Sequence, residues 1–285
     1  MKSKDIAQIL DKSNFTRRIY LVHSKVVKQI QFTIICIFIA TISYAKCAGN
    51  GIYLLSDNTA LNKNGLIILE FYAYSRLLIP DLNKKYPVYI KSSKSKIPMV
   101  IAEILTGEFN VSQVVLKAAS APVENERYLL IIDNLPAYER VPQKYNEQTQ
   151  KMENLEFTFS GITDTALPVL TAQVTEAGKT FVRYGCGPEK YVYFNISGSD
   201  GSELFARASV KNKLSGKTTE YILPIENGQI KIGHGMCAGF IDFDKGTNYE
   251  ASIALMDQSG NKSEETQTIA FSCPYKETEE ELMGK

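Results

Sequence analysis

Beyond about residue 50, hydrophobic side chains recur at every second position in short runs, and turn-forming residues separate these runs. A period of two places alternate side chains on opposite faces of a β-strand. Short alternating runs between regularly spaced turns are typical of all-β sandwiches. In the first half of the chain this pattern predicts strands at residues 51–55, 66–74, 88–91, 100–104, 113–116, 128–132 and 155–159. No stretch after the leader has the apolar period of an amphipathic helix, so we predict no core helix.

The second half has the cleaner alternation, and it predicts strands at residues 191–196, 221–225, 229–232 and 249–255. Asn227-Gly228 lies between two of them and predicts a tight hairpin turn. Pro224 has no backbone N–H to donate, so we expect it at a sheet edge or a bulge. Four side chains of the last run are expected to share one strand face: Tyr249, Ala251, Ile253 and Leu255.

Two polar segments bear on the domain boundaries. Residues 141–154 contain few large aliphatic side chains and could be a domain linker or a long loop. We favour a loop inside the first domain, before a closing strand at 155–159. Residues 161–168 form turn-rich sequence and predict the boundary between domains. We therefore expect a leader at 1–45, one sandwich at 46–162, a second at 163–274 and an acidic tail at 275–285.

A motif near the end of the second sandwich resembles a known family. Tyr249 follows the turn at Gly246, alternating small and apolar residues come next, and the run ends as Asp257-x-x-Gly260-Asn261-x-Ser263. This pattern resembles the late strands of fibronectin type III-like and bacterial immunoglobulin-like domains. Residues 164–169 (DTALPV) look like the opening segment of such modules. The resemblance covers residues 164–274, whereas over 47–162 only the strand pattern is similar.

The resemblance implies an all-β chain of two tandem immunoglobulin-like β-sandwich domains. It also implies roles in adhesion, spacing or binding, which is analogy from fold. In related sandwiches a tyrosine forms a corner, in which its hydroxyl bonds back to nearby backbone. Tyr249 is the candidate for this role, and Tyr128 is a looser match in the first domain.

The leader indicates transport across a membrane. Residues 32–45 form an almost unbroken apolar run behind a basic stretch, and Ser43 and Ala45 are small, as signal peptidase requires. A membrane span needs roughly 20 apolar residues, and this run is shorter. The leader is thus read as an export signal cut after Ala45, which places the mature chain in the periplasm, at the cell surface or outside the cell. The alternative is an uncleaved membrane anchor that leaves residues 1–31 in the cytoplasm.

Cysteine content is consistent with export. Cys36 lies in the apolar run, so four cysteines remain after cleavage: Cys47, Cys186, Cys237 and Cys273. An even number in an oxidising compartment predicts two disulfides, and four cysteines allow three pairings. We favour Cys186–Cys237 within the second sandwich, which leaves Cys47–Cys273 by default. No two of them have the close spacing of a zinc site.

Charge excludes one class of partner. The formal net charge is +1, but residues 1–45 carry seven of the 32 Lys and Arg side chains and only two of the 31 Asp and Glu side chains. The mature chain is therefore acidic, and it offers no sign of the basic face that nucleic acid binding needs. A membrane is expected as a partner only if the leader is uncleaved.

Few residues could carry catalysis. Of the two histidines, His23 lies in the leader, so only His234 remains. His234 could activate Cys237 as a nucleophile, but a turn with an oxidised cysteine is the favoured interpretation. Asp242 and Asp244 are predicted to lie on one solvated strand face.

The alternatives for this acidic pair are a glycosidase pair and a calcium site completed by Asp257 or Glu264. Counted from Asp242, the EF-hand pattern fails because Ile253 takes the twelfth position. Phosphate-binding glycine loops and nucleophile elbows are missing from the sequence. We predict no cofactor, metal ligand or catalytic residue.

Together these observations predict a non-enzymatic exported module, binding or structural, that contacts a protein or glycan of unknown identity through its loops. Two alternatives remain open: a membrane-tethered accessory subunit of an envelope assembly, and a hydrolase that uses carboxylates.

Overall fold

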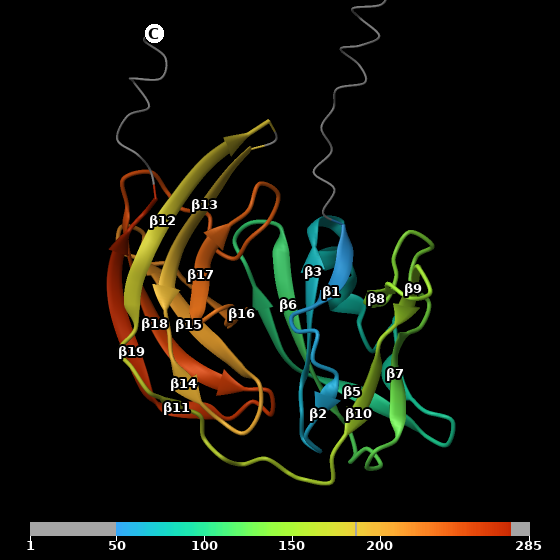
Figure 1. The fold of residues 1–285 in the computed structure, drawn as a ribbon. Helices are drawn as coiled ribbons and strands as arrows, with labels where there is room; N and C mark the ends of the chain where they lie inside the picture. Colours follow the sequence, from blue (N-terminus) through green and yellow to red (C-terminus); the bar gives the residue numbers. More distant parts are fainter. Residues whose placement is uncertain (1–49, 186, 275–285) are drawn as a thin grey trace, which may run out of the picture. The chain divides into compact units, whose positions relative to one another are not determined.

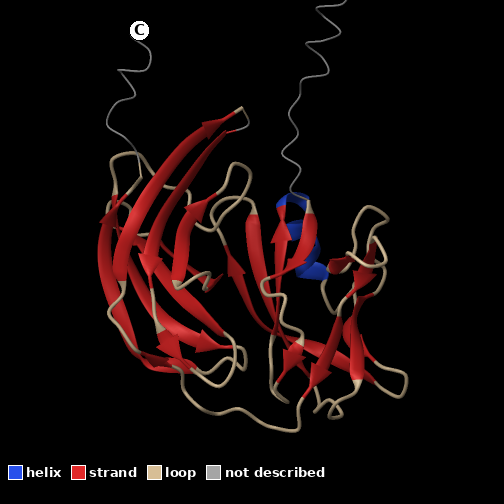
Figure 2. Ribbon diagram, in the orientation of Figure 1, coloured by secondary structure: helices blue, strands red, loops and turns tan. Residues whose placement is uncertain are grey.

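The computed structural model describes residues 50–185 and 187–274 of the chain. The predicted leader and tail, Cys47 and Cys186 lie outside these residues. The described part consists of strands and one short 3-10 helix (Figures 1 and 2), which confirms the all-β prediction. Within this part, none of the helical structure has the length and apolar content needed to span a membrane.

The first sandwich is one curled sheet of eight strands in the order β1-β3-β6-β5-β4-β7-β10-β2. Neighbours are antiparallel except β10 and β2. The long strand β5 pairs with β4 through its first residues and with β6 through the rest, with a bulge between Ile101 and Glu103. This lets the sheet fold around one core that includes Phe71, Ile90 and Tyr128. The bounds are β1 Gly51–Leu54, β2 Ala60–Leu61, β3 Ile67–Tyr72, β4 Val88–Lys91, β5 Lys96–Thr106, β6 Val111–Ala118, β7 Arg127–Ile132 and β10 Glu156–Phe159.

The second sandwich has a three-stranded sheet, β12-β13-β17, and a four-stranded sheet, β16-β15-β18-β19. All neighbours are antiparallel, and the seven strands enclose one core, as in an immunoglobulin-like sandwich. Tyr249, Ala251, Ile253 and Leu255 are buried on one face of β18, as predicted. The bounds are β11 Val169–Leu170, β12 Thr175–Tyr184, β13 Gly187–Asn195, β14 Gly198–Ser199, β15 Leu204–Asn212, β16 Thr218–Pro224, β17 Gln229–His234, β18 Asn248–Asp257 and β19 Lys262–Ser272.

The two sandwiches share part of their core and belong to one compact unit. Residues Val111–Leu116 of β6 are buried throughout, so both faces of this strand are covered. Val114 and Leu116 face the core of the first sandwich. Val111 and Val115 belong to the core of the second, with Tyr221 and Leu223 from β16.

Two predictions for the first sandwich are wrong. Ala73–Asp81 forms a 3-10 helix, η1, which buries Ser75, Leu78 and Ile79, although no core helix was expected. The predicted loop at 141–154 contains an exposed hairpin of β8, Gln143–Asn146, and β9, Lys151–Asn154. Polar cross-strand pairs hold this hairpin, such as the Gln143 amide donating to Asn154 Oδ1 at 2.9 Å. An apolar alternation therefore could not reveal it.

Turn chemistry in the second sandwich agrees with the sequence. Asn227 and Gly228 have φ values of 52° and 74°, and the left-handed region at both positions defines the tight hairpin turn. Pro224 ends β16, which is an edge strand. Strands β12, β15 and β19 were not predicted. Their exposed faces are polar, or their inward positions hold small residues such as Ala206 and Ala208.

Candidate functional site

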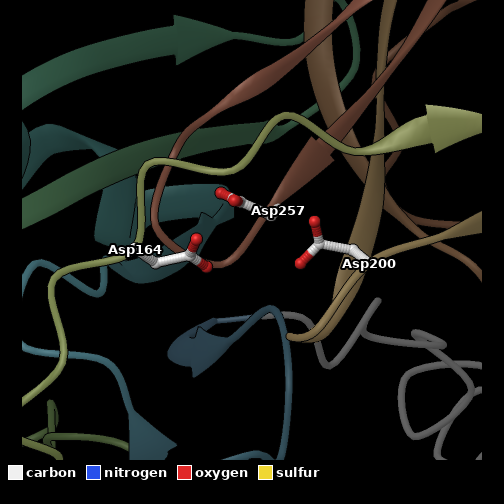
Figure 3. A group of neighbouring side chains, drawn as sticks. All are labelled: Asp164, Asp200 and Asp257. Carbon is white, nitrogen blue, oxygen red and sulfur yellow. The ribbon is translucent and has the colours of Figure 1, made fainter.

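Three carboxylates meet where the opening segment of the second sandwich passes the end of β18. Asp164, Asp200 and Asp257 each place an oxygen within 4.8 Å of the others, and Figure 3 shows the side chains converging from three segments. Asp257 was predicted from the sequence as an alternative calcium ligand, whereas Asp200 was not singled out. Asp242 and Asp244, its predicted companions, do not belong to this cluster.

Backbone and amide donors already surround these carboxylates. The Asp257 carboxylate accepts hydrogen bonds from the Ser259 N–H (2.9 Å), the Asn261 N–H (2.8 Å) and the Asn261 side-chain amide (2.7 Å). These bonds close the turn of the Asp-x-x-Gly-Asn-x-Ser motif. The Asn261 amide also donates to the backbone oxygen of Asp164 at 3.2 Å. The motif thus ties the opening segment to the late turn.

The remaining two acids have their own donors. The Asn62 amide donates to Asp164 Oδ2 at 3.1 Å, and the Ser202 N–H donates to Asp200 Oδ1 at 2.8 Å. Burial raises the pKa of Asp257, and the negative charges of Asp164 and Asp200 add to this effect against the opposing bonds from Asn261. Oxygen atoms suit a hard cation such as Ca²⁺. The bonds within the protein account for the positions of all three side chains, so the geometry by itself assigns a structural role.

A buried tyrosine hydroxyl bonds back to the backbone in each sandwich. Tyr249 accepts a hydrogen bond from the backbone N–H of Asp244 at 2.8 Å, which is the bond that the corner prediction requires. Tyr128 accepts one from the N–H of Val123 at 2.9 Å, also five residues upstream. Burial raises the pKa of Tyr249 to about 12. The looser match in the first sandwich therefore has the same local geometry.

His234 is buried among structural contacts. Its Nδ1 lies 2.7 Å from the carbonyl oxygen of Gly235, and a carbonyl can only accept, so Nδ1 donates. Its Nε2 lies 3.3 Å from Asp242 Oδ1, close enough for an ion pair but without hydrogen-bond geometry. The same oxygen lies 3.4 Å from Nζ of Lys190, which is also buried. Asp242 therefore connects β17 and β13 through these two side chains.

The segment that holds Asp242 and Asp244 is not a strand, which corrects the prediction. Ile241 and Phe243 are buried and alternate with the two exposed acids. The predicted alternation of buried and exposed side chains is therefore present, but the segment does not pair with a neighbouring strand. The Asp244 carboxylate accepts a hydrogen bond from the Asn212 amide at 2.7 Å. Each acid thus has a separate structural partner.

The two predicted disulfides, Cys186–Cys237 and Cys47–Cys273, have different outcomes. The carbonyl oxygen of Met236 lies 3.3 Å from the position of a Cβ built on Gly187, so the chain next to Cys186 passes the chain next to Cys237. Cys186 itself is outside the described residues, and its bond to Cys237 stays a prediction. Cys273 has a free thiol buried in the core of the second sandwich. The default pairing Cys47–Cys273 is therefore not present at Cys273, where packing against core side chains takes its place.

The chain matches no model of a protein family, and no characterised protein matches it by sequence. Among solved structures it is similar to the type I pullulanase from Bacillus subtilis str. 168 complexed with maltose, at 9% identity and a TM-score of 0.22 over 77% of this chain and 24% of that one. It thus spans about a quarter of that enzyme.

Two further similar structures are modular proteins. The FN1–FN3 domains of chicken CNTN1 match at 10% identity and a TM-score of 0.25, over 79% of this chain and 67% of that one. The tetra-tandem repeat in the extending region of a large adhesion protein matches at 10% identity and a TM-score of 0.24, over 79% and 50%. Similarities of this size carry no argument about ligand or activity, and the fold class rests on the strands themselves.

Proposed function

We propose that this chain is a non-enzymatic module that works outside the cytoplasm, where its two sandwiches act as one rigid body that binds or spaces a protein or glycan partner. The observation that carries the proposal is the interface between the sandwiches, which combines a shared hydrophobic core with hydrogen bonds and an ion pair. Domains joined by a small interface move relative to each other by default, whereas a hydrophobic interface holds them.

The interface supports rigidity through bonds that fix its register. The Gln113 amide donates to the backbone oxygen of Ile222 at 2.6 Å and accepts from the Ile222 N–H at 2.9 Å. Arg207 of the second sandwich donates from two nitrogens to the Glu103 carboxylate of the first, at 2.7 and 2.6 Å. A two-pronged pair of this kind fixes orientation as well as distance. A module held in this way presents its loops in constant positions.

The contacts of the potential catalytic side chains support a non-enzymatic role. His234, Asp242 and Asp244 each contact groups that join neighbouring segments of the second sandwich. A general base must instead reach a proton on a substrate. Substituting these residues is thus expected to change stability first.

Export is supported by the leader and by the approach of the chains beside Cys186 and Cys237. Fractionation of the host, followed by intact-mass measurement of the purified chain, tests this part. A soluble species that begins at Lys46 outside the cytoplasm supports the exported module. A full-length 31.8 kDa species in the membrane fraction supports the tethered accessory subunit instead. A full-length soluble chain in the cytoplasm contradicts both.

A further inference from the structure

A groove of about 390 Å³ opens on the first sandwich, beside β1 and the hairpin β8–β9. Its walls come from three segments: β1 with residues on either side of it, residues 138–144, and Met152 and Leu155 in and after β9. Cavities of this size are large enough for a small organic ligand or for part of an oligomer. No residue of this groove was singled out by the sequence analysis.

Exposed tyrosines form part of the wall. Tyr138 is 75% exposed and Tyr53 is 49% exposed, so a ligand in the groove can reach both rings. The Tyr53 ring meets Tyr72 edge-to-face at 5.3 Å, and its hydroxyl donates to the Asn50 carbonyl oxygen at 3.4 Å. These contacts hold the Tyr53 ring in place before any ligand binds. Tyrosine offers an apolar face and a polar tip in the same side chain.

A buried carboxylate belongs to the same lining. Glu139 is only 7% exposed, and its Oε1 accepts a hydrogen bond from the Ser75 hydroxyl at 2.6 Å. Ser75 Oγ in turn accepts from the Gly51 N–H at 2.8 Å, so η1 and β1 both fix this carboxylate. These bonds fix the Glu139 carboxylate before any ligand binds, and a fixed carboxylate accepts a ligand hydroxyl with little further ordering.

The charges of the lining select among ligands. Asp57 and Glu139 are balanced by Arg140 and Lys144. A cationic ligand would meet the two basic groups, and an anionic ligand would meet the two acidic groups. An uncharged ligand with many hydroxyls can donate to the acids, accept from the bases and lay its C–H faces on the tyrosine rings.

From this combination we infer that the groove is a binding site for a neutral saccharide. Tyr53 and Tyr138 contact sugar faces, and Glu139 Oε2 accepts a sugar hydroxyl. The inference deepens the proposed function, and rests on it, by naming glycan rather than protein as the ligand at this surface.

The test uses the full chain and four neutral probes: cellotetraose, maltotetraose, chitotetraose and mannotetraose, each titrated to about 10 mM by calorimetry. At least one probe is expected to bind. Tyr138→Ala and Glu139→Gln should each weaken that binding about tenfold, equivalent to about 1.4 kcal/mol. Tyr184→Ala is the control, because Tyr184 is also exposed, at 49%, but lies on β12, outside the groove.

Binding of none of the four probes overturns the saccharide inference, and so does binding that both groove variants leave unchanged. Because Tyr138 is exposed, its replacement keeps the fold, which thermal unfolding verifies. Mass spectrometry of the recovered probe separates the two levels of the proposal. An intact probe agrees with a non-enzymatic module, whereas a cleaved probe contradicts the proposed function even where binding is confirmed.

Discussion

The side-chain amide of Gln113 pairs with the backbone of Ile222 as a neighbouring strand would, donating to its oxygen and accepting from its N–H. Gln113 is fully buried on β6, and Ile222 lies in β16, an edge strand of the second sandwich. The amide therefore satisfies backbone groups at an edge that would otherwise be left without partners in the interface. A single side chain thus links the sheets of the two sandwiches.

Replacing Gln113 with Ala should lower the free energy of unfolding by about 2–4 kcal/mol, because both backbone groups of Ile222 lose their buried partners and a cavity forms. Urea unfolding measures the change. Gln148→Ala is the control, since Gln148 is exposed in the turn of the β8–β9 hairpin. A Gln113→Ala chain as stable as this control would show that the pairing contributes nothing.

Removing the hydroxyl of either corner tyrosine should lower the stability of the protein by a similar amount. Tyr249→Phe and Tyr128→Phe each leave a backbone N–H without its acceptor, so each should lower the free energy of unfolding by about 1–3 kcal/mol. Tyr74→Phe is the control, because Tyr74 is 72% exposed. Thermal unfolding of the three variants measures these changes. A loss of stability in Tyr249→Phe but not in Tyr128→Phe would restrict the tyrosine corner to the second sandwich.

Glu70 gives the interface a pH dependence. Burial raises the pKa of Glu70 above its usual 4.5, although bonds donated by Tyr72, Gln113 and Tyr221 oppose this. The folded protein thus holds the Glu70 proton more tightly than the unfolded chain does. The stability from protonated Glu70 is complete below pH 4.5 and is lost as the pH rises through the folded-state pKa.

Glu70→Gln keeps a neutral hydrogen-bonding group and removes the titration. Its free energy of unfolding relative to the wild type should therefore rise as the pH increases from about 4 to 7. Urea unfolding of both proteins across this pH range measures the difference between their free energies of unfolding. Titrating groups that the two proteins share contribute equally to both values, so they cancel in the difference. A difference that stays constant or falls over the range would contradict the assigned direction.

The acidic cluster offers a test of structural against cation-binding roles. If the cluster has a structural role and binds no cation, Asp200→Asn removes the electrostatic repulsion between Asp200 and Asp257. The free energy of unfolding measured in EDTA should then rise by about 0.5–1 kcal/mol. Calcium should then change the melting temperature of neither the wild type nor the variant. A wild-type chain that calcium stabilises, with the effect lost in Asp200→Asn, would instead show a cation site.

The sequence predicts those parts of the fold whose burial leaves a periodic pattern of hydrophobic residues. Alternation located β18 and its buried face because Tyr249, Ile253 and Leu255 are large and face a core. The same approach missed β12, where neither face is deeply buried. It also missed η1, although Ser75, Leu78 and Ile79 have helical spacing, since one short turn gives little periodic signal.

The sites depend on contacts that are distant in sequence. The apolar run around Gln113 is typical of a strand buried on both faces, but it does not say that Ile222 covers the second face. Asp200 joins Asp257 only because the loop after β14 returns to the end of β18. Glu139 becomes buried because η1 places Ser75 beside it. None of these partners has a local signature.

The central claim, that the two sandwiches form one rigid body, is tested most directly by hydrogen–deuterium exchange of the protein at increasing urea concentrations, with the peptides of each sandwich followed by mass spectrometry. If the shared interface unites them, peptides from β3 and β6 and peptides from β15 and β18 lose protection at the same urea concentration. Loss of protection in one sandwich at a clearly lower concentration, while the other stays protected, would contradict the claim.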